Sequence, residues 1–135
     1  MKVGFIGIGT MGASMASNVR AKGYDLVVND IRREAAAPHL KAGATWADSA
    51  RKVAEAADVV FTSLPGPRDV EAVAEELLAG MRKGTAWFDL STNSPTVVVV
   101  LPSPAGVGVM AVTRMSLPFG LPFRLSTYSR ETLAL

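Results

Sequence analysis

Three glycines near the start of the chain, Gly7, Gly9 and Gly12, have the spacing GxGxxG. Between them, such glycines allow a sharp turn off a strand, close approach of a pyrophosphate to the backbone, and close packing of the following helix on that strand. The N–H groups and the positive dipole end of that helix attract an anion. The motif therefore indicates dinucleotide binding, and a glycine-rich turn in another kind of α/β protein is the alternative.

An acid, Asp30, follows the glycines at the distance found in dinucleotide-binding folds, about 20 residues. There a carboxylate accepts hydrogen bonds from the adenosine ribose hydroxyls and repels a 2′-phosphate. Asp30 therefore predicts NAD as the preferred cofactor over NADP. An aspartate that only ends a strand or caps a helix is the alternative. Arg32 and Arg33 oppose the prediction, because an arginine here could bind a phosphate.

Strands and helices must position these residues, and the hydrophobic pattern alternates between the two. The pattern predicts strands at residues 3–8, 24–29, 44–46, 59–64 and 85–90, each followed by a helix or a turn. Pro38 lies inside the second helical stretch, so that helix is expected to kink or to start late. The alternation predicts a Rossmann-type, doubly wound, mainly parallel sheet with helices on both faces and the strand order 3-2-1-4-5-6.

Composition excludes several kinds of site and suits one domain with a core. The chain has no cysteine, which excludes disulfides and thiolate chemistry, and its single histidine, His39, cannot form a metal site alone and is expected to be solvated. No basic stripe interleaved with aromatic residues indicates nucleic-acid binding. Neither a signal peptide nor a membrane-spanning run is visible, so we expect a cytoplasmic protein that contacts no membrane.

Four blocks of sequence, in order along the chain, resemble the β-hydroxyacid dehydrogenases. They are GFIGIGTMGASMASNV, KAGATWADS, ADVVFTSLPGPRDV and WFDLSTNSP, at residues 4–19, 41–49, 57–70 and 87–95. This family includes 3-hydroxyisobutyrate dehydrogenase and is related to 6-phosphogluconate dehydrogenase. The resemblance implies that residues 1–97 are the NAD(P)-binding domain of an oxidoreductase. The full-length enzymes of the family transfer a hydride between a nicotinamide cofactor and a small 3-hydroxy acid.

The resemblance also implies which residues bind the cofactor. The glycine loop would hold the pyrophosphate, Asn29 and Asp30 the adenosine ribose, Leu64 and Pro65 the nicotinamide side, and Thr92 the nicotinamide-ribose end. The full set is Gly7, Gly9, Thr10, Met11, Gly12, Asn29, Asp30, Leu64, Pro65 and Thr92. By spacing alone, Leu64-Pro65 is equally consistent with a plain strand exit and Thr92 with an ordinary turn hydroxyl. Relatives that use NADP often carry Asn-Arg where this chain has Asn29-Asp30.

The resemblance stops at about residue 97. The DAPVSGG-like substrate loop of the family is absent, and Pro102 and Pro104 exclude a regular helix there. We interpret residues 98–135 as a divergent tail with a sixth strand at 107–112 and otherwise irregular structure. A shifted reading frame or a fragment end would explain it. The apolar residues of the stretch 117–123 predict self-association.

Nothing in the sequence corresponds to the family's catalytic lysine or to its all-helical second domain. We therefore assign no catalytic residue and no metal ligand, and we expect the chain alone to be inactive. A small hydroxy acid would be a substrate only of a full-length enzyme. Two alternatives are open: a non-enzymatic cofactor-binding or interaction module, and another nucleotide-cofactor enzyme such as a methyltransferase.

Overall fold

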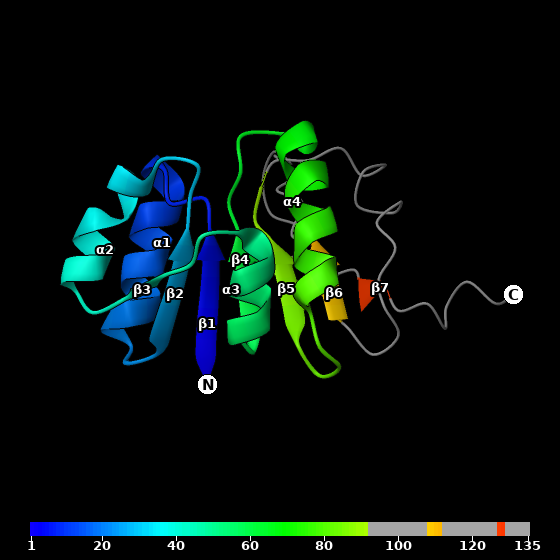
Figure 1. Ribbon diagram of the computed structural model, residues 1–135, viewed down its shortest axis with the longest axis horizontal. Helices are drawn as coiled ribbons and strands as arrows, with labels where there is room; N and C mark the ends of the chain where they lie inside the picture. Colours follow the sequence, from blue (N-terminus) through cyan, green and yellow to red (C-terminus); the bar gives the residue numbers. More distant parts are fainter. Residues whose placement is uncertain (92–107, 112–126, 129–135) are drawn as a thin grey trace, which may run out of the picture.

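The computed structural model is built around one sheet and describes residues 1–91, 108–111 and 127–128 (Figure 1). The strands follow the order β3-β2-β1-β4-β5-β6-β7, and all neighbours are parallel except β6 and β7. The strands are β1 Lys2–Ile6, β2 Asp25–Asn29, β3 Thr45–Trp46, β4 Val59–Thr62, β5 Ala86–Asp89, β6 Gly108–Ala111 and β7 Thr127–Tyr128. The helices are α1 Thr10–Ala21, the 3₁₀ helix η1 Arg33–Ala36, α2 Ala37–Lys41, α3 Ala50–Ala56 and α4 Pro67–Gly80. The predicted doubly wound parallel fold and its strand order are confirmed.

Alternation along β1 sends side chains into two separate cores, one on each face of the sheet. Val3 and Phe5 pack with α1, η1 and α2, whereas Ile6 packs with α3 and α4. A row of phenylalanines crosses the first of these faces. The ring centroids of Phe5 and Phe61 are 6.1 Å apart, and those of Phe61 and Phe88 are 5.3 Å apart. Both faces are therefore covered by helices, as Figure 1 shows.

The second helical stretch begins late, as its proline predicts. Residues Arg33–Ala36 form η1, and α2 starts only at Ala37, with Pro38 in its first turn. The expectation of a solvated His39 is wrong, because this side chain is 4% exposed. Ala36, His39 and Leu40 have the spacing i, i+3, i+4 of one helix face, and that face is turned toward the sheet. The position of His39 on the helix, and not the polarity of its neighbours, decides its burial.

Two strands follow β5 in the described part of the chain. Strand β6 falls within the predicted range 107–112 and pairs parallel with β5, while β7 pairs antiparallel with β6 and was not expected. Apart from Thr127–Tyr128, where β7 replaces the expected irregular structure, the prediction of irregular structure concerns residues outside the described ranges and stays a prediction. Self-association and the domain boundary also stay predictions. None of the described helices has the length and apolar character needed to cross a bilayer.

Candidate functional site

A cavity of about 910 Å³ lies where β1, β2 and β4 end. In parallel α/β sheets, ligands bind at this edge, where the strand order reverses. The cavity brings together all the predicted cofactor-binding residues except Thr92, which lies outside the described residues. Those lining it are Gly7, Gly9, Thr10, Met11, Gly12, Asn29, Asp30, Leu64 and Pro65.

The glycine loop is packed too tightly for side chains at two of its positions. Gly7 has φ of +84°, and a Cβ there would collide with the carbonyl oxygen of Ser63 at the end of β4. A Cβ at Gly12 would collide with the carbonyl oxygen of Gly7 itself. The first and third glycines thus let the chain turn off β1 and let α1 pack directly against the turn.

Gly9 differs, because a Cβ built on it meets no atom within 4 Å. Gly9 caps α1 without a side-chain hydrogen bond, and the first turn of α1 contains no acidic residue. The first hydrogen bond of this helix runs from the N–H of Ala13 to the carbonyl oxygen of Gly9, at 2.8 Å. In the described structure, the preceding N–H groups of Thr10, Met11 and Gly12 therefore have no partner, and these three residues line the cavity. Such a helix end binds an anion well.

The carboxylate of Asp30 holds the glycine loop in place. Its Oδ2 accepts a hydrogen bond from the N–H of Ile8, at 2.8 Å, and its Oδ1 accepts one from the N–H of Arg32, also at 2.8 Å. Each carboxylate oxygen still has capacity for a further donor. The side-chain amide of Asn29 donates to the carbonyl oxygen of Ala47, at 2.8 Å, and so joins the end of β2 to the segment after β3.

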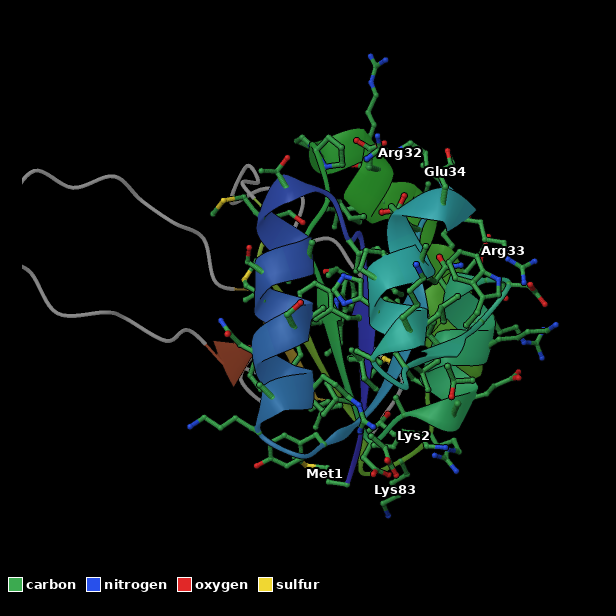
Figure 2. The ribbon with its side chains drawn as sticks, turned by 90° about the vertical axis from the view of Figure 1, so that its left-hand side faces the viewer. Met1, Lys2, Arg32, Arg33, Glu34 and Lys83 are labelled. Atoms are coloured by element: carbon green, nitrogen blue, oxygen red, sulfur yellow. The ribbon has the colours of Figure 1, made fainter. Side chains whose placement is uncertain are left out.

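Carboxylates outnumber cations among the charged groups that line the cavity. They are Asp30, Asp48, Asp69 and Glu76, with the cations Arg32 and Arg33. A hydrogen bond from Trp46 and then the nearby Lys52 hold the pKa of Asp48 below its usual value, so this exposed carboxylate is charged at neutral pH. Arg33 lies over the Trp46 ring, 5.5 Å from its centroid, whereas Arg32 extends away from the protein in Figure 2.

Several lining residues were not assigned from the sequence. Ser63 belongs to the strand exit, Trp46 is the last residue of β3, Asp48 follows that strand, and α4 contributes Asp69 and Glu76. Their position was the signal, since each lies at the end of a predicted strand, just after one, or in the helix that follows one. The described residues contain no group of three or more acids or histidines that could hold a metal ion.

Comparison with known proteins identifies one family model and several relatives that match this chain. The sequence model of the family described as the NAD binding domain of 6-phosphogluconate dehydrogenase matches residues 2–102 of this chain. The chain is 41% identical over 98 residues to the NAD-dependent L-serine dehydrogenase of Pseudomonas aeruginosa, covering 70% of this chain and 33% of that one. It is 40% identical over 97 residues to the mitochondrial 3-hydroxyisobutyrate dehydrogenase of Drosophila melanogaster, covering 71% of this chain and 30% of that one.

A solved structure matches over a longer stretch of the chain. It is the Mycobacterium tuberculosis 3-hydroxyisobutyrate dehydrogenase with L-serine, which is 30% identical, with a TM-score of 0.76. The match covers 83% of this chain and 40% of that one. The chain thus spans about a third of the length of the two curated relatives.

Proposed function

Since the chain belongs to the family of NAD-binding domains typified by 6-phosphogluconate dehydrogenase, we propose that its glycine-loop cavity binds NAD in preference to NADP. The resemblance seen in the four sequence blocks is thereby confirmed, and so is nicotinamide-dinucleotide binding as a class. One structural observation supports the proposal independently of the family match. The unpartnered N–H groups of α1 and the carboxylate of Asp30 line one cavity, so both an anion and a ribose would find partners there.

The residues present fit a dinucleotide. A pyrophosphate at the start of α1 would accept hydrogen bonds from the N–H groups of Thr10, Met11 and Gly12 and would lie at the positive end of the helix dipole. The open side of Gly9 gives its oxygens access to the backbone. We propose that Leu64 and Pro65, across the cavity, contact the nicotinamide side, with Thr92 at its ribose.

The charge of the cavity favours NAD. The 2′-phosphate of NADP would lie next to Asp30, whose carboxylate is fixed by two backbone N–H groups and cannot easily turn away. At about 4 Å, two unit charges repel by roughly 1 kcal/mol in water and 4 kcal/mol at a protein surface. Arg33 is stacked on Trp46, and Arg32 points outward, so neither is held in place for a phosphate.

Titration with both cofactors tests the preference. The native chain should bind NAD more tightly than NADP, and Asp30→Asn should lower the ratio of the two affinities at least about fivefold, which corresponds to 1 kcal/mol. Asp25→Asn is the matched control, because Asp25 is an exposed aspartate at the opposite end of β2, 4.0 Å from Arg20. Tighter binding of NADP by the native chain, or an unchanged ratio in Asp30→Asn, would refute the preference.

We further propose that the full protein is a β-hydroxyacid dehydrogenase-like oxidoreductase. The bound nicotinamide would supply or accept the hydride, while this chain binds and orients the dinucleotide. The relatives are named for 3-hydroxyisobutyrate and L-serine, so a small 3-hydroxy acid is the proposed substrate class. A spectrophotometric assay of the full-length protein with such acids and NAD tests this. The cytoplasmic location also stays a proposal, tested by fractionation, since the Drosophila relative is named mitochondrial.

A further inference from the structure

A buried hydrogen-bond network joins the ends of β4 and β5 beside the cavity. Its side chains are those of Thr62, Trp87, Asp89 and Ser91, and none is more than 4% exposed. None of these residues lines the cavity. The network nevertheless reaches the cavity wall, because Ser91 Oγ accepts a hydrogen bond from the N–H of Leu64, at 2.8 Å.

The directions of the hydrogen bonds that link these four residues and Leu64 follow from the groups at the two ends, the Trp87 indole and the Leu64 N–H. The indole Nε1–H of Trp87 can only donate, and it donates to Thr62 Oγ1 at 3.0 Å. The Thr62 hydroxyl therefore gives its own hydrogen to Asp89 Oδ1, at 2.8 Å. A backbone N–H also can only donate, so the Ser91 hydroxyl accepts from Leu64 and gives its hydrogen to the same Asp89 oxygen, at 2.6 Å. The N–H of Ser91 donates to this oxygen as well, at 3.1 Å.

Asp89 thus stands at the meeting point of two arms. The core arm runs through Thr62 to Trp87, and the loop arm runs through Ser91 to Leu64. The loop arm has little support from elsewhere. Ser63 donates to the carbonyl oxygen of Ile6, at 2.9 Å, and Pro65 has no N–H to donate. Among the hydrogen bonds of the described residues, the bond from Leu64 to Ser91 is the one that ties the centre of this loop to β5.

We infer that Asp89 and Ser91 are positioning residues that hold the Leu64-Pro65 loop against the nicotinamide end of the bound cofactor. The inference rests on the proposed function. Neither residue touches the cofactor: Asp89 fixes the hydroxyl of Ser91, and Ser91 fixes the loop. Loss of the loop arm should therefore weaken recognition of the nicotinamide half and leave recognition of the ADP-ribose half unchanged.

The test compares NAD with ADP-ribose, which lacks the nicotinamide, as ligands of the native 135-residue chain and of Ser91→Ala. We expect Ser91→Ala to bind NAD about tenfold more weakly and ADP-ribose within about twofold of the native affinity. Amide hydrogen exchange should also show faster exchange at Leu64 in this variant. Thr62→Val is the matched control, because it breaks the core arm of the same network. It should lower the melting temperature without changing the ratio of the two affinities.

The outcomes separate the inference from the function on which it rests. A native chain that binds neither ligand would refute both. A native chain that binds both ligands, with Ser91→Ala lowering the two affinities equally or not at all, would refute the inference alone. Should Ser91→Ala fail to fold, Ser91→Cys keeps the shape with a weaker acceptor and gives the same comparison.

Discussion

Replacing Gly9 by alanine should separate cofactor binding from stability. The backbone of Gly9 has φ −69° and ψ −162°, which alanine adopts, and the added methyl group meets no atom within 4 Å. A glycine-to-alanine change at such a site gains about 0.4–1 kcal/mol through the unfolded chain. Alanine is a poorer helix cap than glycine, by about 0.5–1 kcal/mol. The two effects offset each other, so we expect the free energy of unfolding to change by less than about 1 kcal/mol.

Binding should respond far more strongly to the same methyl group. A hydrogen bond from a loop N–H needs its acceptor oxygen about 2.9 Å away. A methyl carbon, by contrast, keeps heavy atoms about 3.5 Å from itself, so a pyrophosphate at Gly9 would be pushed off the loop. A hydrogen bond to a charged group contributes about 1.5–3 kcal/mol. Losing one bond should therefore lower the affinity for NAD about 10- to 150-fold.

Calorimetric titration with NAD and thermal unfolding of the same samples measure the two effects. Gly66→Ala is the control, since Gly66 also caps a helix in an extended conformation, and its new Cβ would lie an ordinary 3.9 Å from Asp69 Oδ2. An affinity of Gly9→Ala within twofold of the native value would show that the pyrophosphate does not approach the backbone at Gly9. A large loss of stability would show that a methyl group at position 9 does collide with neighbouring atoms.

Three further predictions concern the same chain. Gly12→Ala should lower the free energy of unfolding by about 1–3 kcal/mol, as measured by chemical denaturation, because the new methyl group would press on the carbonyl oxygen of Gly7. Unchanged stability would contradict the packing of α1 on the turn. The difference in unfolding free energy between the native chain and Asp48→Asn should be fully present above pH 3.8, the ordinary pKa of an aspartate. It should disappear as the pH falls through the lowered pKa of folded Asp48, because the folded state binds that proton less readily. A difference that grows in acid would contradict this sign. The purified chain should show no hydride transfer with small 3-hydroxy acids, and turnover that survives removal of host enzymes would overturn this.

Most of the fold can be predicted from the sequence because the strands are short apolar runs bounded by turn residues such as glycine. Gly7, Gly23 and Gly43 have positive φ and follow the ends of β1, α1 and α2, and Gly84 has positive φ in the turn before β5, all places where glycine is the residue that fits. The late start of α2 follows from the proline in its first turn. Strand β7 could not be predicted, because a two-residue strand is formed by its partner β6 and leaves no periodic pattern of its own.

Residue spacing predicts one side of the cavity, whereas Leu64 and Pro65 on the other side are assigned only through the family resemblance. The glycine loop and Asp30 have the spacing of a dinucleotide-binding motif, GxGxxG followed by an acid about 20 residues later, and both line the cavity. The network under the loop after β4 has no such spacing. Thr62 and Asp89 lie in β4 and β5, which become neighbours only when the sheet forms, and parallel pairing sets Thr62 opposite Asp89, with Ser91 just after β5. Residues joined by register in this way have separations in sequence that carry no local signal.

The bonds that fix the glycine loop bear on how fast a ligand can bind. Gly7 N–H donates to the carbonyl oxygen of Asn29, at 3.0 Å, and Ile8 N–H donates to Asp30, so hydrogen bonds within the chain itself fix the shape of the loop. A preorganised anion site loses little conformational entropy on association. Mixing with NAD in a stopped-flow instrument should then give a single exponential phase. Its rate should rise linearly with cofactor concentration and show no plateau from a slow folding of the loop.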